Sequence, residues 1–525
     1  MIELFGKRPT RLLSASDLWA LLAWLILAAG YYVWTWSPVL ANFGGDNAVY
    51  LMTAESYSPY FSHGPVAQFF ASHSQYPPLF PFMLAILGGG KSLLVSHLIT
   101  TTFLVAALPV FYVLLKTQEL GKWKSLALVA LFALLPGTYM EALDILSENL
   151  YLLFTLTALL CVSLADTTSS RGWLWAAAVS IAAACLTRSA GVALAVAFGL
   201  YLWASKTPRK TALFGAAILP MFAWQAVGQG SGRANYYRSL VQTFSHHPLQ
   251  ALQNQMSVEM HALGYGWLAN FIDARYAIWA IALIGLLCLA GTLHRLIQKK
   301  IDGFYIALYL ALILIWPFPD EATRFAFVIV PILLMQGTLL ATNLARAASA
   351  KTPLAGLLPA VVLLVPALLV APTVGLTIQR FQTPLPPNLE PYKHTPGWYA
   401  ADPREAVDHI QFNAGFEGSF MAVKQAVPAH ACIFSIKPSI VSYLSGRMSV
   451  SPPVGSTNAG EFSTGLRKAG CRYVYFAPFA SPTFPQPFYP AARLGNTVKV
   501  VADYQIGHEK NGMIGLVGVL GELTR

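Results

Sequence analysis

Apolar runs recur along most of the chain and determine the expected secondary structure. A helix needs roughly 17–25 mostly apolar residues to cross a bilayer. The longer runs reach that length before glycine, proline or charged residues interrupt them. The pattern therefore predicts a polytopic α-helical membrane protein with about eleven transmembrane helices. The predicted spans are residues 18–37, 93–115, 124–140, 147–165, 172–187, 190–204, 211–228, 276–293, 303–318, 325–345 and 354–376.

The Lys and Arg residues predict how these helices are oriented. Cytoplasmic loops of membrane proteins carry more positive charge than outer loops. With the N-terminus in the cytoplasm, the inner segments hold 15 Lys and Arg residues and the outer segments up to residue 376 hold 6. We therefore expect a cytoplasmic N-terminus. This orientation puts Asp46, Glu141, Asp144, Glu148 and Glu321 on or near the outer face.

Two outer segments are long enough to hold structure of their own. The first, residues 38–92, has apolar positions that predict helices along the membrane surface at 48–57 and 65–72, and a third, apolar helix that dips into the membrane at 78–87. The second, Gly228 to Arg275, is expected to be partly ordered or to act as a lid. The alternative is a mobile loop whose polar residues are only solvated.

The composition changes to that of a soluble domain after a proline-rich connector at 384–391. We therefore divide the chain into a transmembrane module, 1–380, and an outer α/β domain, 381–525. The expected strands are 431–436 and 472–476, a terminal hairpin is expected at 498–504 and 514–520, and helices are expected at 440–444 and 462–469.

Of the five cysteines, two fall in the predicted soluble domain. Cys432 and Cys471 each begin a predicted strand, and they could form a disulfide if those strands are neighbours. Cys161, Cys185 and Cys288 lie within spans, where they are expected only to pack.

Composition agrees with a membrane protein and excludes some other classes. The chain has 525 residues, of which 56% are apolar and 11% are charged, a combination that is rare in soluble domains. The net charge of +11 does not indicate a nucleic-acid partner, because most basic residues lie in short loops between spans. The sequence contains no phosphate-binding glycine loop and no zinc-ligand spacing.

Asp46 is the main catalytic candidate. It follows the glycine pair of Phe43-Gly-Gly-Asp46-Asn-Ala-Val-Tyr50, just after the first span. Glycine lets another molecule approach the backbone closely, and an ionisable group at a membrane boundary is often functional. The alternative is an Asp that caps the following helix.

A second group of acids lies in the third outer loop. Glu141, Asp144 and Glu148 have no cation nearby in the sequence. Close carboxylates repel one another, so a metal ion, a cationic partner or a protonated member is expected. These acids, with Glu321, are candidates for acceptor binding or for a second acid. The alternatives are acids that stabilise a helix start and a simple Glu321–Arg324 ion pair.

Cations at the same face complete the candidate chemistry. Moving a sugar from a phosphate to a hydroxyl needs a base for the nucleophile and cations for the leaving phosphate. Asp46 could accept the proton, and Arg188 and Arg324 could bind the phosphate. His73 and Tyr76 could add hydrogen bonds, and a lipid tail would lie between the spans.

Five motifs, in this order, resemble those of the GT-C superfamily of polyprenyl-phosphate-sugar glycosyltransferases. Their residues cover roughly positions 15–345. The branch that looks most similar contains bacterial proteins related to protein O-mannosyltransferases and the lipid A aminoarabinose transferase. The motifs are Gly45-Asp-Asn-Ala-Val-Tyr50, Tyr76-Pro-Pro-Leu-Phe-Pro81, Ser147-Glu-Asn-Leu-Tyr151, Leu186-Thr-Arg-Ser-Ala-Gly191 and Glu321-Ala-Thr-Arg-Phe325.

The resemblance implies a multi-span fold with surface helices in the first periplasmic loop, and inverting transfer from undecaprenyl or dolichyl phosphate. It implies that Asp46 is the catalytic Asp and that Arg188 and Arg324 contact the lipid phosphate. It also implies a bacterial inner membrane location with domain 381–525 in the periplasm. Asn47 follows Asp46, where the family often has an acid, and this difference argues against a metal site in the first loop. A divalent cation at Glu141, Asp144 or Glu148 stays an open alternative.

Three interpretations of function remain. The preferred one is an inverting glycosyltransferase that acts at the outer face. Its partners are a polyprenyl-phosphate-linked sugar, membrane lipids and an acceptor that is a lipid, a glycan or a protein. The second is a transporter or flippase of a lipid-linked or polar solute, although the sequence shows no matching halves. The third is a non-catalytic assembly protein that docks through its soluble domain.

Overall fold

The computed structural model divides the chain into two compact units. The helical unit comprises Met1–Trp36, Gln75–Phe80 and His97–Arg380, and the mixed unit comprises Ser37–Ser74, Pro81–Ser96 and Phe381–Arg525. The structure describes residues 17–40, 42–207, 209–227, 241, 248–268, 277–316, 322–348, 357–400, 402–452, 459–468, 470–478, 484, 487–489, 494, 497–506 and 515–524.

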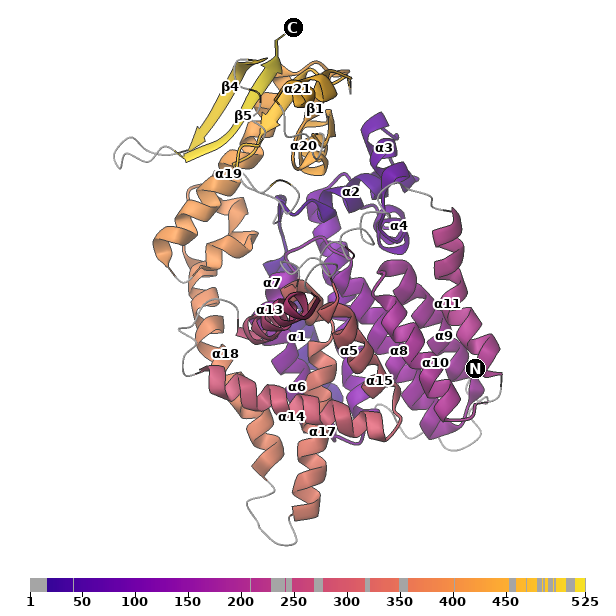
Figure 1. Ribbon diagram of the computed structural model, residues 1–525. Helices are drawn as coiled ribbons and strands as arrows, with labels where there is room; N and C mark the ends of the chain where they lie inside the picture. The colour runs from indigo at the N-terminus through magenta and orange to yellow at the C-terminus, as the bar shows by residue number, and fades with distance from the viewer. Residues whose placement is uncertain are drawn as a thin grey trace. The chain divides into compact units, whose positions relative to one another are not determined.

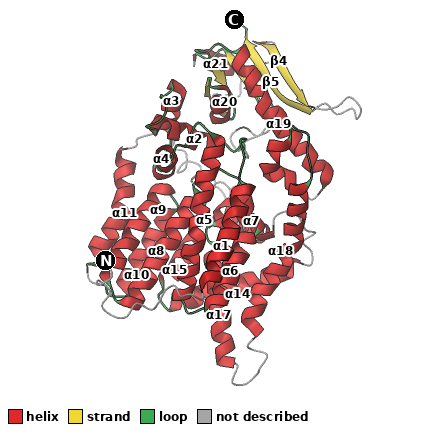
Figure 2. Cartoon of the chain, turned by 180° about the vertical axis from the view of Figure 1, so that it is seen from behind, coloured by secondary structure: helices red, strands yellow, loops and turns green. Residues whose placement is uncertain are grey.

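The helical unit is built from helices that mostly run beside one another (Figures 1 and 2). The closely packed pairs include α8 with α9, α9 with α11, α10 with α15 and α14 with α17. In chain order the helices are α1 (Leu18–Trp34), α5 (Leu93–Thr117), α6 (Lys122–Leu134), α7 (Pro136–Glu141), α8 (Glu148–Thr168), α9 (Arg171–Thr187), α10 (Gly191–Ala204), α11 (Lys210–Val227), α13 (Pro248–Leu268), α14 (Ala277–Ile297), α15 (Ile301–Leu314), α16 (Ala322–Phe327), α17 (Val330–Ala348) and α18 (Leu358–Gln382).

Four described helices are long and apolar enough to cross a membrane: Leu93–Thr117, Glu148–Thr168, Trp279–Ile297 and Leu358–Gln382. Shorter apolar helices cover Leu18–Trp34, Arg171–Thr187, Gly191–Ala204 and Ile301–Leu314. The predicted multi-pass architecture is therefore confirmed, whereas the number eleven stays a prediction.

Two predicted spans are interrupted. The run 124–140 divides into α6 and α7 because Leu135 is extended, with φ −63° and ψ 133°, and Pro136 begins a new helix. Proline restricts the residue before it to extended conformations. The run 325–345 divides between α16 and α17 at residues 328 and 329.

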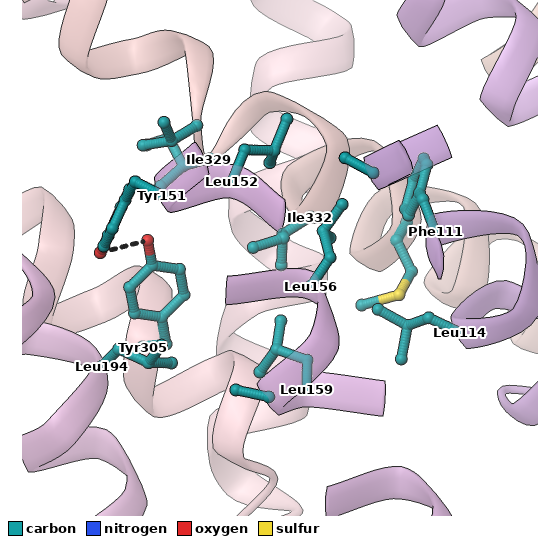
Figure 3. Packing of buried hydrophobic residues seen from close by; sticks show 14 of the residues in the cluster. Phe111, Leu114, Tyr151, Leu152, Leu156, Leu159, Leu194, Tyr305, Ile329 and Ile332 are labelled. Atoms are coloured by element: carbon teal, nitrogen blue, oxygen red, sulfur yellow. Dashed lines mark hydrogen bonds between the residues drawn. The ribbon is translucent and has the colours of Figure 1, made fainter. Parts of the chain in front are cut away.

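Close side-chain packing fills the middle of the helical unit. Leu152, Leu156 and Leu159 on α8 are buried within one apolar cluster (Figure 3). Lipid tails are as apolar as leucine, so such helices associate mainly through van der Waals contact. At Gly291 on α14, an added Cβ would lie 2.5 Å from the Gln336 carbonyl oxygen of α17. Only glycine allows this approach.

Ion pairs gather at the helix ends opposite the start of α8. Asp17, 5% exposed, accepts bonds from Tyr112 Oη at 2.7 Å and from Lys116 Nζ at 3.0 Å. Arg295 donates to Asp302 at 2.6 and 2.7 Å. These charges are paired, as buried charges near a membrane must be.

The mixed unit contains a five-stranded sheet with the order β2-β1-β3-β5-β4. Its strands are β1 (Cys432–Phe434), β2 (Met448–Val450), β3 (Tyr473–Phe476), β4 (Val498–Ile506) and β5 (Gly515–Leu523). Strand β1 pairs in parallel with β2 and β3, and β5 pairs antiparallel with β3 and β4. The predicted neighbours β1 and β3 and the terminal hairpin are confirmed, and Cys432 and Cys471 form a disulfide.

Helices flank this sheet, and one of them was not predicted. Helix α19 (Pro403–Ala426) packs Phe420 against Tyr475 of β3, with ring centroids 4.9 Å apart. The predicted helices correspond to α20 (Pro438–Ser445) and α21 (Ala459–Lys468). Two short 3₁₀ helices precede α19, η5 (Glu390–His394) and η6 (Pro396–Tyr399).

The first-loop helices are confirmed as α2 (Asp46–Tyr57), α3 (Pro65–His73) and α4 (Leu79–Ile86). By their contacts, α2 and α3 belong to the mixed unit, where α2 packs against α3 and α20. Most of the first outer loop, Ser37–Ser74 and Pro81–Ser96, therefore belongs to the same unit as the C-terminal segment Phe381–Arg525.

Candidate active site

A buried cluster of two arginines and one glutamate lies at one end of the helical unit. Arg188 and Arg324 both form ion pairs with Oε1 of Glu148. The side chain of Glu148 is 1% exposed, and those of Arg188 and Arg324 are 10% and 14% exposed. One carboxylate thus serves two guanidinium groups.

A tight helical hairpin positions Arg188. Helix α9 ends at Thr187, and Arg188 is extended, with φ −145° and ψ 142°. Its carbonyl accepts a bond from Gly191 N at 2.9 Å. A Cβ on Gly191 would lie 2.7 Å from the backbone of Cys185. Helix α10 can therefore start directly against the last turn of α9 only with glycine at this position.

The start of α8 presents Glu148. It is the first residue of the helix, where the helix dipole favours a negative charge. One turn later, the Tyr151 hydroxyl bonds the Tyr305 hydroxyl at 3.1 Å (Figure 3) and the Ala190 carbonyl at 3.4 Å. Two of the five motifs, 147–151 and 186–191, are therefore in contact through both Glu148 and Tyr151.

The third motif in contact is carried by α16. Its Phe325 ring centroid lies 5.0 Å from Cζ of Arg188 and 6.0 Å from Cζ of Arg324, so each cation lies near the aromatic ring. Tyr309 of α15 donates to the Phe325 carbonyl at 3.1 Å. Helix α13 packs on α7 and α16, which accounts for part of the predicted ordered second loop.

Glu141 and Asp144 lie beside this cluster and are partly or fully buried. Burial, and then the charges of Glu148 and Asp144, raise the pKa of Glu141 well above its ordinary value. Among the described residues, Oε1 of Glu141 has no hydrogen-bond partner. The expected repulsion of close carboxylates is thus relieved by arginines at Glu148 and by a raised pKa at Glu141. The described residues contain no group of three metal-ligating side chains.

Asp46 is the first residue of α2, in the mixed unit, and is half-buried. Gly45 before it has φ +107°, a conformation that side chains rarely allow. The Gly44 carbonyl accepts a bond from Lys437 Nζ at 2.9 Å, and the Gly45 carbonyl accepts one from Ser439 Oγ at 3.1 Å. The turn before Asp46 is therefore bonded to residues of α20 and its N-cap.

The remaining predicted residues divide between the units. His73 is exposed at the end of α3, with its ring stacked on Phe69 at 4.3 Å. Tyr76 is half-buried in the helical unit. Glu321 lies outside the described residues. The structure brings Glu148, Arg188 and Arg324 together, with Glu141 and Asp144 close enough for electrostatic coupling.

Sequence reasoning missed Phe325, Lys437 and Ser439 as contacts of the candidate site residues. Phe325 could have been noticed as an aromatic residue next to Arg324. No local signal identifies Lys437 or Ser439, because their partners Gly44 and Gly45 are separated from them by 393 and 394 positions in the sequence.

Comparison with known proteins finds a family match over part of the chain and a similar fold. Residues 64–224 match the model of the dolichyl-phosphate-mannose-protein mannosyltransferase family. That stretch includes Glu141, Asp144, Glu148 and Arg188. A search of curated proteins found no match.

Among solved structures, the chain resembles ArnT from Cupriavidus metallidurans in the apo state. The TM-score is 0.53 at 12% sequence identity, and the match covers 97% of this chain and 98% of that chain. ArnT bound to undecaprenyl phosphate gives a TM-score of 0.49 at 12% identity, with 97% and 98% of the two chains covered.

The chain is therefore a multi-pass membrane protein with an additional C-terminal sheet. More narrowly, the partial family match and the ArnT-like fold support the resemblance to the GT-C superfamily of glycosyltransferases that the five motifs carry.

Proposed function

We propose that this protein is an inverting glycosyltransferase that moves a sugar from a polyprenyl-phosphate donor to an acceptor at the outer face of the membrane. The observation that carries the proposal is the pairing of Arg188 and Arg324 with one buried carboxylate. Guanidinium groups bind phosphate through charge-assisted hydrogen bonds. Two such groups held side by side favour binding of an anion such as a phosphate.

The leaving lipid phosphate supplies that anion. As the bond from the anomeric carbon to the phosphate oxygen breaks, negative charge develops on the phosphate, and Arg188 and Arg324 stabilise it. His73 and Tyr76 add hydrogen bonds. ArnT, whose fold the chain shares, has been solved with undecaprenyl phosphate bound, which supports a polyprenyl phosphate as the donor carrier.

Asp46 acts as the general base on the acceptor. It takes the hydroxyl proton while the acceptor oxygen forms the new bond to the anomeric carbon, and the configuration at that carbon inverts. Glu141, Asp144 and Glu321 contribute to the acceptor side. The described residues do not offer a ligand set for a divalent cation, so we assign no step to one.

The orientation completes the proposal. The protein lies in a bacterial inner membrane with its N-terminus on the cytoplasmic side and residues 381–525 in the periplasm. The polyprenyl tail of the donor stays among the helices. The positive-inside distribution of Lys and Arg supports this arrangement.

Release of polyprenyl phosphate tests the reaction. Full-length protein in vesicles receives undecaprenyl phosphate charged with mannose or arabinose, and envelope lipids and glycans as acceptors. Released undecaprenyl phosphate is measured by mass spectrometry. Asp46→Asn should lower transfer by roughly 100-fold or more, the usual scale for a lost general base, and donor binding should persist.

Asp408→Asn is the matched control, because Asp408 is exposed on α19, and it should keep normal transfer. Near-normal turnover in Asp46→Asn would remove Asp46 from the mechanism. Movement of the lipid across the vesicle membrane without phosphate release would favour a transporter instead.

A further inference from the structure

The turn that carries Asp46 is intrinsically flexible. It consists of Gly44 and Gly45, and glycine loses more conformational freedom on ordering than any other residue. The N-cap residue Gly45 has no side chain with which to cap α2. Asn42 Oδ1 accepts a bond from Gly44 N at 2.6 Å, but this contact lies within the same loop. Two more bonds lie within this segment, because Asn47 Nδ2 donates to the Asn42 carbonyl at 2.5 Å and Val49 N donates to the Gly45 carbonyl at 3.2 Å. Contacts from outside the turn restrict the direction of Asp46 further.

Two side chains at the start of α20 bind the backbone of this turn. Lys437 Nζ donates to the Gly44 carbonyl at 2.9 Å, and Ser439 Oγ donates to the Gly45 carbonyl at 3.1 Å. The contact with Ser439 is close, because a Cβ on Gly45 would lie 3.0 Å from Ser439 Oγ. Both peptide groups that precede Asp46 are therefore held by one element.

The same face of α20 also reaches the segment that packs behind α2. Tyr443, four residues after Ser439, lies on the same side of the helix and donates to the Gly90 carbonyl at 3.2 Å. Gly90 packs directly on α2, since a Cβ there would lie 2.9 Å from Glu55 N. Helix α20 thus supports α2 near both of its ends.

Helix α20 is itself fixed to the sheet. The Ser442 hydroxyl accepts a bond from Ser449 N of β2 at 2.9 Å. Strand β1, which precedes α20, is bonded to both neighbouring strands. Arg447, just after α20, donates to the Val427 carbonyl at 2.8 Å and the Lys424 carbonyl at 2.6 Å. A rigid support of this kind can orient a flexible turn.

Helix α19 holds the entry to the turn in the same way. Oε1 of Glu417 accepts a bond from Leu40 N at 2.8 Å, and the Phe43 ring packs on Phe416 with centroids 4.8 Å apart. Four residues before Asp46 are therefore in contact with residues 416–439: Leu40, Phe43, Gly44 and Gly45.

We propose that Lys437 and Ser439 are positioning residues that aim Asp46 at the acceptor, and that orienting this turn is the role of the C-terminal sheet and its helices. This inference rests on the proposed function, since the turn matters for turnover only if Asp46 is the base. Misplacing a catalytic group by about 1 Å can cost about 100-fold in rate.

The test uses Lys437→Met, Ser439→Ala and the double variant in the full-length protein, with two readouts. Hydrogen exchange of residues 42–50 should become about 10-fold faster in the double variant, whereas exchange in β1, β3 and α8 should not change. With the charged undecaprenyl phosphates described above, kcat should fall at least about 10-fold and the donor KM should stay within about 2-fold.

Matched controls separate positioning from general loss of structure. Lys468→Met and Ser451→Ala change exposed residues and should leave both readouts unchanged. Lys437→Arg keeps a cationic donor and should recover most of kcat.

Unchanged exchange at 42–50 in the double variant would overturn the inference, and so would normal kcat in a variant whose turn exchanges faster. Faster exchange in the variant, together with no transfer by the wild type, would overturn the proposed function while supporting the anchoring of the turn.

Discussion

Replacing Glu148 by glutamine changes the charge of the buried cluster while keeping its shape. In the wild-type protein one carboxylate, 1% exposed, binds both Arg188 and Arg324. The Glu148→Gln variant retains an oxygen that accepts a hydrogen bond but loses the negative charge. Two guanidinium groups then share a buried space without their common counter-ion.

The expected cost in stability follows from the burial. Removing one partner of a buried ion pair typically costs about 3–5 kcal/mol, because the other charge remains unpaired. Here the side chains of Arg188 and Arg324 are 10% and 14% exposed to solvent, so water screens their charges slightly. We expect a loss near the lower end, about 3 kcal/mol.

The expected gain in binding has the same origin. If Arg188 and Arg324 hold the donor phosphate, the Glu148 carboxylate repels that phosphate in the wild-type protein. Two unit charges 4 Å apart interact by about 4 kcal/mol at an effective dielectric constant of 20. Part of this repulsion is lost when Glu148 becomes neutral, so affinity for undecaprenyl phosphate should rise at least about 10-fold, which corresponds to about 1.4 kcal/mol.

Thermal unfolding in detergent, with and without undecaprenyl phosphate, measures both effects. The variant should unfold at a lower temperature than the wild type without lipid, and the added lipid should stabilise it by a larger amount. Glu405→Gln is the control, because Glu405 is 61% exposed on α19, and it should behave as wild type. Equal or weaker lipid binding by Glu148→Gln would refute the assignment of Arg188 and Arg324 to the phosphate.

Two further predictions follow from the structure. Gly191→Ala places a Cβ 2.7 Å from the Cys185 backbone, so it should destabilise the α9–α10 hairpin by about 1–3 kcal/mol and lower transfer by displacing Arg188, as unfolding and activity assays would measure. Burial raises the pKa of Glu417 to about 7, above its value in the unfolded chain, so the folded mixed unit holds this proton more tightly. The stability of the folded mixed unit should therefore fall as pH rises through about 7. The Glu417→Gln variant should show no difference in unfolding temperature between pH 6 and pH 8.

Hydropathy predicted most helices because lipid-facing and buried positions are both apolar. The same property hides the breaks inside an apolar run. The extended residue Leu135 separates α6 from α7, which begins at Pro136. Residues 328 and 329 separate α16 from α17. Both runs nevertheless stay hydrophobic along their length. A proline marks both breaks, because Pro136 begins α7 and Pro331 is the second residue of α17. A proline ring clashes with the carbonyl four residues earlier, which for Pro331 belongs to Phe327, the last residue of α16.

Helix α19 shows what the sequence analysis overlooked. Asp402 caps it by accepting a bond from Arg404 N, Pro403 is its first residue and Glu405 follows, which is a recognisable helix start. Gly415 and Gly418 lower its helix propensity and hid the rest of the helix. Gly415 is explained by packing, since a Cβ there would lie 2.2 Å from Ile506 Cγ2.

The candidate site was partly predictable. Charge counting put Glu148, Arg188 and Arg324 on one face, but not in one ion-paired cluster, because Glu148 lies 176 positions before Arg324. Pairing over such a separation depends on how α8, α9 and α16 pack. The roles of Asp46, His73 and Tyr76 remain predictions.

The Asp17–Lys116 pair has a consequence for how the protein is made. Asp17 lies just before α1, and its cation lies 99 residues later, near the end of α5. When the ribosome has produced only the first helix, Lys116 has not yet been synthesised. The contact that joins the start of α1 to α5 can therefore form only after α5 is complete, so these two helices reach their final packing together.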